Sequence, residues 1–196
     1  MTSGEGGPAG QRDEIEVKLP CEDLRAAGEK LRRLGATLEA PLHFESNDLY
    51  DDAEGRLAAS GRALRLRRAN DQTILTFKGA ARFSDGVKIR EERETRVSDL
   101  EEARAILLGL GFTPRFRYEK KREEWKLGEC AIALDETPIG TFVEIEGGPP
   151  AIRRLVASLG LDFTRAIPYT YARLYAERRK ADPSLPPDMV FPEHPR

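Results

Sequence analysis

The most constraining feature of this chain is a strict alternation of charged and apolar residues in several separate segments. In DEIEVKLP, residues 13–20, the charged residues Glu14, Glu16 and Lys18 alternate with apolar ones. Successive side chains of a β-strand point to opposite faces, so this pattern predicts a strand with one charged face and one apolar face. The same alternation recurs in ALRLRR, ILTFKG, KIREERETRV, RYEKKREEW, IALDE and FVEIEG.

Strands and helices follow one another along the chain. Apolar residues at helical spacing predict helices within residues 21–36, 98–112, 148–161 and 167–180, and glycines follow the first three stripes at Gly35, Gly111 and Gly160. The connections between strands are short, which favours antiparallel pairing. The predicted strands are residues 13–20, 37–51, 62–69, 73–79, 87–97, 113–127, 129–136 and 141–147.

The helices indicate which face of the strands is inside. If the apolar faces formed the interior of a barrel, the apolar stripes of the four helices would have no surface to cover. If the helices pack on those apolar faces from outside, the charged faces must converge in the middle. We therefore predict an α+β fold, an eight-stranded antiparallel β-barrel with a charged tunnel and helices packed outside. An open sheet with one face in water is the alternative.

The charges of such an interior indicate its ligand. Carboxylates supply hard oxygen ligands for Mg²⁺ or Mn²⁺, while Arg and Lys match phosphate oxygens, so a metal-bound polyphosphate satisfies both sets. Mutual ion pairing without a ligand is the alternative, at several kcal/mol of desolvation per ion. The bases are Lys18, Arg65, Arg67, Lys78, Arg90, Lys120 and Arg122, and the acids are Glu14, Glu16, Glu92, Glu94, Asp135, Glu144 and Glu146.

These motifs resemble those of the CYTH family, the triphosphate tunnel metalloenzymes. Its N-terminal ExExK strand corresponds to residues 14–18, and the similarity continues through LRLR, TFKG, REERET, KKREEW and ALDETPIGTFVEIEG, over roughly residues 13–175. The spacing is similar to that of the class IV adenylate cyclase-like branch. The resemblance implies an eight-stranded tunnel, dependence on a divalent metal and a substrate with a linear triphosphate: inorganic triphosphate, thiamine triphosphate or ATP.

The resemblance also implies a role for each charged residue. Metal binding falls on Glu14, Glu16, Glu144 and Glu146, with Glu92, Glu94 and Asp135 as further candidates. Phosphate binding falls on Lys18, Arg65, Arg67, Lys78, Arg90, Lys120 and Arg122. A lysine whose pKa falls among other cations would help to orient or activate the nucleophile, and Lys18 and Lys78 are the candidates.

Three functions remain open at this point. The leading one is a metal-dependent triphosphatase, since positioning and charge neutralisation supply most of what phosphoryl transfer needs. A class IV adenylate cyclase, which converts ATP to cyclic AMP and pyrophosphate, would use the same tunnel. A noncatalytic polyphosphate-binding barrel is the third, although binding alone would not need the full set of acids.

Composition limits the partners. The chain has 32 Lys and Arg against 34 Asp and Glu, which argues against nucleic acid as a partner. No segment has the apolar length of a signal peptide or a membrane helix, so we expect a cytoplasmic protein, a monomer or a homodimer, that binds no membrane. We divide it into a disordered tail (1–12), the tunnel domain (13–180) and a proline-rich tail outside the fold (181–196).

Four other features are given ordinary structural roles. Cys21 and Cys130 have no metal-ligand spacing and are read as small buried hydrophobic residues. His43 is expected on a wall or at the surface rather than as a base. The aspartates of residues 48–52 are expected to end a strand, because they lack the spacing of a calcium-binding loop.

Overall fold

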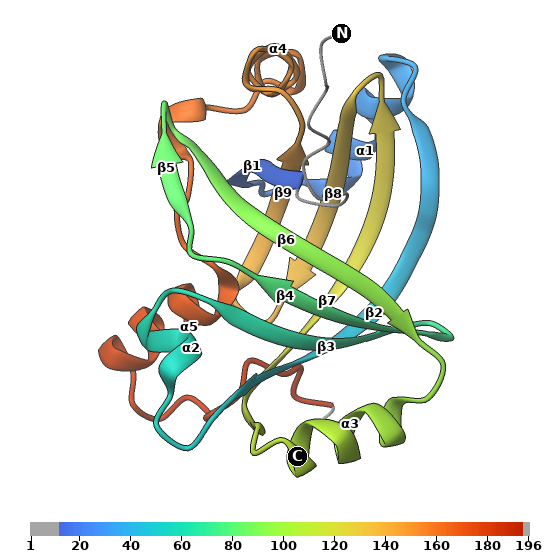
Figure 1. Ribbon diagram of the computed structural model, residues 1–196. Helices are drawn as coiled ribbons and strands as arrows, with labels where there is room; N and C mark the ends of the chain where they lie inside the picture. The colour runs from blue at the N-terminus through green and yellow to red at the C-terminus, as the bar shows by residue number, and fades with distance from the viewer. Residues whose placement is uncertain (1–11, 194–196) are drawn as a thin grey trace, which may run out of the picture.

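The computed structural model describes residues 12–193, with side chains from residue 14 onward. Eight strands close into a barrel in the order β1-β9-β8-β7-β2-β3-β4-β6, and β6 pairs with β1 to complete it (Figure 1). All pairs are antiparallel, which confirms the predicted barrel. The strands are β1 (Arg12–Pro20), β2 (Thr37–Asp51), β3 (Ala63–Ala69), β4 (Gln72–Lys78), β5 (Arg82–Ser84), β6 (Val87–Val97), β7 (Thr113–Leu127), β8 (Cys130–Thr137) and β9 (Gly140–Glu146).

The four predicted helices are present. They are α1 (Leu24–Arg33), α3 (Leu100–Gly109), α4 (Pro149–Leu159) and α5 (Tyr171–Ala181). The glycines expected to end the first three helices, Gly35, Gly111 and Gly160, all have positive φ, at 82°, 86° and 69°. That left-handed conformation suits a residue without a Cβ and turns the chain away from the helix.

The main apolar core lies outside the barrel. α1 and α4 cover the outer face of β1, β8 and β9, where Val17 and Ile145 pack in one buried cluster with Leu31 and Ile152 (Figure 1). Each such aliphatic side chain contributes about 1.5–3 kcal/mol when it is fully buried. Because the apolar faces of these strands point outward to the helices, their charged faces point inward, as predicted.

Two smaller clusters complete the outer layer. α3 covers β2, β3 and β4 on a different side of the barrel from α1 and α4, with Ala103 and Leu107 against Leu66 (Figure 1). Tyr171 and Tyr175 of α5 pack with aromatic residues of β7 and β9. No helix in the described part of the chain is long and apolar enough to cross a membrane.

Three short elements were not predicted. β5 pairs only with β6, as a hairpin that extends beyond the closed barrel, and its three residues are too few to show alternation. α2 (Arg56–Ala59) is held by the Asp51 carboxylate, which accepts from the backbone N–H groups of Leu57 and Ala58. η1 (Phe163–Arg165) is a single 3-10 turn between α4 and α5. Asp51 ends β2, as expected.

The C-terminal segment does not extend away from the fold, which corrects the expectation for residues 181–193. Met189 is fully buried and donates from its N–H to Arg117 O at 3.0 Å, while Glu119 N donates to Met189 O at 2.9 Å. The reason is a free edge: β8 pairs only with the second half of β7, so the backbone around residue 118 needs other partners. The N-terminal tail expected at residues 1–12 lies outside the described residues, except for Arg12, which begins β1.

Candidate active site

A cavity of about 750 Å³ occupies the barrel interior. All the predicted bases line it, and so does every predicted acid except Asp135. The register explains why, since directly opposed residues share a face: Lys18 pairs with Glu144, and Glu16 with Glu146. The charged lining residues are Glu14, Glu16, Lys18, Arg65, Arg67, Lys78, Lys88, Arg90, Glu92, Glu94, Lys120, Arg122, Glu144 and Glu146.

The cavity wall is electrostatically asymmetric. Every acid that lines it comes from the three adjacent strands β9, β1 and β6. The opposite side of the barrel consists of β3, β2 and β7. The charged residues that β3 and β7 contribute to the lining are all cations. Some of these cations still reach acids of the other strands, since Arg67 Nη2 lies 3.5 Å from Glu94 Oε2 and Arg122 Nη2 lies 2.5 Å from Glu144 Oε2. The separation fits a ligand that carries both a metal cation and phosphate groups.

Glu146 is the centre of the acidic side. It lies directly across from Glu16, and like charges in this position repel. Burial, followed by the charges of Glu14 and Glu16, raises the pKa of Glu146. Among the described side chains, none of the cations lies within 4.0 Å of its carboxylate. Glu14, Glu16 and Glu146 offer the hard-oxygen ligands that a divalent cation prefers, but their oxygens do not all lie within 4.8 Å of one another, so a cation would have to draw the three side chains together.

Glu14 and Glu16, unlike Glu146, already have lysine partners, and so does Glu92. Lys78 Nζ lies 3.0 Å from Glu14 Oε2 and also donates to Glu92, and Lys88 Nζ donates to Glu16. Burial and Arg65 lower the pKa of Lys78, but Glu14 and Glu92 outweigh them and the pKa is raised. Mutual ion pairing is therefore part of this interior, and Lys78 shows none of the lowered pKa expected of a catalytic lysine.

Lys18 is held at the end of the cavity beside α5. Its Nζ donates to Tyr169 O at 3.1 Å, lies 3.3 Å from Glu144 Oε1 and sits 3.7 Å from the centroid of the Tyr171 ring. The aromatic face stabilises the ammonium group. Burial raises the pKa of Glu144, but Lys18, Lys120 and Arg122 hold it well below its usual range.

Asp135 lies behind the cavity wall rather than on it. Its carboxylate is fully buried and accepts from Arg122 Nε and Nη2 at 2.6 and 2.7 Å, from Tyr171 OH at 2.8 Å and from Lys120 Nζ at 3.2 Å. Both oxygens are thus occupied by protein donors. The structure places this predicted metal ligand where it orients two cavity cations.

Arg65 and Arg67 emerge side by side from β3. Arg65 donates to Tyr118 OH at 3.3 Å and to Thr76 Oγ1 at 3.2 Å, and Arg67 Nη1 lies 3.4 Å from Glu45 Oε1. The Nε atoms of both arginines are buried without a hydrogen-bond partner in the protein. Leaving such buried donors unpaired costs about 1–3 kcal/mol each. The Nη2 atoms of Arg65 and Arg67 each lie 3.5 Å from Glu94 Oε2 across the cavity.

Arg90 has a different environment from the other cavity cations. Its Nε and Nη2 donate to Gly79 O at 3.1 and 2.6 Å, and burial lowers its pKa. Two of its guanidinium nitrogens therefore bind the protein backbone, which leaves the rest of the group to face the cavity.

Sequence reasoning missed several residues of this site. Lys88 lines the cavity because it has the same parity along β6 as Arg90, a signal that was present in the sequence. Glu45 is fully buried and lies 3.4 Å from Lys120 Nζ, but only the pairing of β2 with β7 reveals this contact. Tyr118 and Tyr171 also line the cavity, and their positions depend on how α5 packs.

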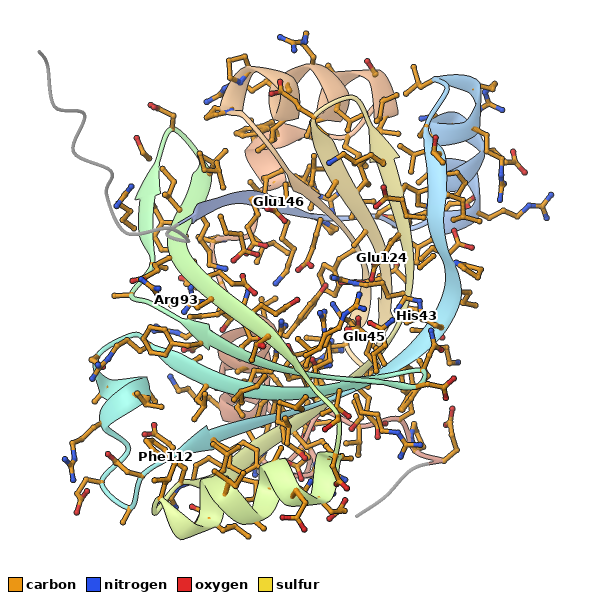
Figure 2. The ribbon with its side chains drawn as sticks, turned by 45° about the vertical axis from the view of Figure 1, so that its right-hand side comes forward. His43, Glu45, Arg93, Phe112, Glu124 and Glu146 are labelled. Atoms are coloured by element: carbon orange, nitrogen blue, oxygen red, sulfur yellow. The ribbon has the colours of Figure 1, made fainter. Side chains whose placement is uncertain are left out.

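His43 lies on the barrel wall beside two acids, as Figure 2 shows. Its Nε2 is 3.6 Å from Glu45 Oε1 and 3.7 Å from Glu124 Oε1, and its Nδ1 contacts Pro41 O at 2.9 Å. A protonated imidazole donates through Nδ1 and places positive charge between the two carboxylates. Glu45 raises the pKa of His43 more than burial lowers it.

We expect His43→Gln to destabilise the protein in acid more than in alkali. A folded-state pKa above the unfolded value of about 6.5 adds stability that is complete below that value and is lost as the pH rises through the folded pKa. Urea denaturation midpoints of both proteins at about pH 5.5 and pH 9 measure this. An equal loss of stability at both pH values would show that His43 acts only by packing.

Comparisons with known proteins agree with this architecture. The family model described as "CYTH domain" matches residues 12–154. The PH1819 protein of Pyrococcus horikoshii is 28% identical, with a TM-score of 0.68 and coverage of 85% of this chain and 99% of that one. The PH1012 protein of the same organism is 24% identical, with a TM-score of 0.68 and coverage of 81% and 96%.

A protein from another organism, Hippeastrum, has the same fold. HpAC1 from Hippeastrum, a candidate adenylyl cyclase described as having a dominant triphosphatase activity, is 23% identical, with a TM-score of 0.60 and coverage of 89% of this chain and 98% of that one. A search of curated proteins found no match. With a family model that matches most of its length and a barrel whose charged residues point inward, this chain belongs to the CYTH family.

Proposed function

We propose that this protein is a divalent-metal-dependent triphosphatase that hydrolyses a linear triphosphate inside the barrel. The observation that carries the proposal is the asymmetry of the cavity, with Glu16 and Glu146 opposed on the acidic side and cations alone on β3 and β7. CYTH proteins include triphosphatases and adenylate cyclases, and HpAC1 shows that one protein named as a cyclase candidate has mainly triphosphatase activity.

The proposed metal site consists of Glu14, Glu16 and Glu146, with Glu144 and the β6 acids Glu92 and Glu94 near it as further ligands. Mg²⁺ or Mn²⁺ bound there would neutralise phosphate charge and lower the pKa of coordinated water.

The cations of this chain would hold and orient the phosphate chain. Arg65 and Arg67 offer forked donors to non-bridging oxygens from β3, and Lys120 and Arg122 do so from β7. Lys78 and Arg90 complete the phosphate-binding set from β4 and β6. In hydrolysis, water bonds to the terminal phosphorus while the bond to the bridging oxygen breaks, and the bridging oxygen leaves with negative charge.

Of the two lysines predicted to be catalytic, Lys18 is the better candidate. Lys78 donates to Glu14, one of the three main proposed metal ligands, so the lysine and a metal would share that acid, whereas Lys18 pairs with none of the three. Lys18 is held by a backbone carbonyl, Glu144 and the Tyr171 ring, in a fixed position at the cavity surface. A lysine fixed in this way can hold phosphate oxygens of the substrate in a reactive position.

Product analysis tests the proposal. The purified protein is incubated with Mg²⁺ or Mn²⁺ and with inorganic triphosphate, thiamine triphosphate or ATP, and the products are separated. Release of phosphate and a diphosphate product supports the triphosphatase. Formation of cyclic AMP and pyrophosphate from ATP would identify a cyclase instead, and binding without turnover of any substrate would leave a noncatalytic barrel.

We expect Arg65→Lys to weaken triphosphate binding by roughly tenfold to a hundredfold. Lysine keeps the charge but loses the forked geometry, and one charge-assisted hydrogen bond is worth about 1.5–3 kcal/mol. Calorimetric titration with inorganic triphosphate measures the change. Arg93→Lys is the matched control, because Arg93 is an exposed residue that pairs with Glu91. Equal affinities for both variants would remove Arg65 from the phosphate site.

A further inference from the structure

Phe83 exposes its ring on the hairpin of β5 and β6, opposite a residue of the cavity wall. It lies directly opposite Lys88 in the pairing of β5 with β6, so the two side chains share a face of the sheet. Lys88 lines the cavity, and Phe83 therefore projects toward the same side. Because β5 extends beyond the closed barrel, no strand covers the ring from across the interior, and Phe83 is 54% exposed.

A second aromatic residue, Tyr169, lies close to Phe83 in the fold. Phe83 and Tyr169 both line a crevice whose other walls include Glu16, Lys18 and Lys88, three residues that also line the main cavity. Tyr169 is 44% exposed, and its carbonyl accepts from Lys18 Nζ. Arg173 lies over the Tyr169 ring, 5.3 Å from the centroid. The crevice thus shares three charged wall residues with the main cavity.

Two exposed aromatic residues, Phe83 and Tyr169, lie on the same part of the surface. Of the large hydrophobic residues exposed in the described part of the chain, the two aromatic ones, Phe83 and Tyr169, both lie here. A single exposed hydrophobic residue needs no explanation, but two exposed rings on either side of one crevice offer stacking surfaces. The crevice itself holds only about 10 Å³, enough for one water, so a ligand ring would stack on the exposed faces.

We propose that Phe83 and Tyr169 form a docking site for the aromatic head group of an organic triphosphate whose phosphates occupy the tunnel. The proposal rests on the proposed function and narrows its substrate class from any linear triphosphate to one with a heteroaromatic ring. Lys18 and Lys88 hold the phosphate chain where the crevice meets the cavity, and the ring extends outward to the two aromatics. Inorganic triphosphate would leave the docking site empty.

The test compares binding of ligands with and without a ring. Phe83→Ala is titrated calorimetrically, in the presence of Mg²⁺, with non-hydrolysable imido analogues of ATP and of inorganic triphosphate. Loss of one stacking partner is expected to weaken the ATP analogue about fivefold to tenfold, near the lower end of measured base stacking, because the ring is half exposed. The affinity for the inorganic analogue should change by less than about twofold.

Two further variants make the test specific. Phe83→Trp should restore binding of the ATP analogue, and its fluorescence should be quenched by that analogue but not by the inorganic one, over the constant signal of the buried Trp125. Leu42→Ala is the matched control, because Leu42 is 59% exposed but does not line either the crevice or the cavity. It should bind both analogues as the parent protein does.

The outcomes separate this proposal from the proposed function. Equal weakening of the organic and inorganic ligands, or no effect of Phe83→Ala on either the ATP analogue or thiamine triphosphate, would overturn the docking site even if the protein hydrolyses triphosphate. A Phe83-dependent preference for the ATP analogue in a protein that cleaves no triphosphate would uphold the docking site and reject the triphosphatase. Competition with thiamine triphosphate extends the test, since a Phe83-dependent preference for either organic ligand supports the proposal and the tighter one identifies the ring.

Discussion

Glu16→Gln is expected to lower the metal-dependent kcat by at least about 100-fold while the barrel stays folded. Glutamine nearly keeps the shape of the side chain but removes an anionic ligand from the trio completed by Glu14 and Glu146. A metal ion contributes several kcal/mol of charge stabilisation to phosphoryl transfer, and about 2.7 kcal/mol corresponds to this factor. Phosphate release measured over a range of Mg²⁺ concentrations gives the change in kcat and in metal dependence.

Thermal unfolding provides a second measurement that does not depend on activity. The parent protein should gain Tm on addition of Mg²⁺, because a ligand that binds only the folded state stabilises it. Glu146→Gln should lose this gain but raise the Tm of the metal-free protein, since it removes the repulsion from Glu14 and Glu16. Glu22→Gln, at an exposed position outside the barrel, is the control. A variant that kept the full Mg²⁺-dependent gain would exclude Glu146 as a ligand.

The sequence allowed most of the fold to be predicted because alternation has a period of two along each strand. A strand with Glu16 and Lys18 on one face and Val17 on the other has one stable orientation once a helix covers the apolar side. Residues 182–191 were harder to predict. Their prolines suggest a tail, and the backbone edge of β7 that Met189 covers is visible only after β8 is seen to end early.

The site was predicted less completely, for a related reason. Parity along a strand shows which residues face inward but not how far each side chain reaches into the cavity. Asp135 and Glu146 both point inward, yet Asp135 is enclosed by donors from β7 and α5, while Glu146 faces like charges. Phe83 lies on a three-residue strand, so only its register with Lys88 reveals which way it points.

Asp135→Asn is expected to lower the free energy of unfolding by about 3 kcal/mol or more. The carboxylate is fully buried and bonds to Arg122, Lys120 and Tyr171, and removing one partner of a buried ion pair typically costs 3–5 kcal/mol because a charge remains uncompensated. Urea denaturation measures the loss. Glu136→Gln is the matched control on the same strand, since its pair with Lys121 is half exposed and should contribute less than about 1 kcal/mol.

The same variant decides between two roles for Asp135. If it orients Arg122 and Lys120, the variant should bind inorganic triphosphate more weakly, because both cations lose their fixed positions, while the Mg²⁺-dependent gain in Tm persists. If Asp135 is instead a metal ligand, stability should change little in the metal-free protein and the gain on adding Mg²⁺ should be lost. Because both oxygens of the carboxylate are already occupied by protein donors, we expect the first result.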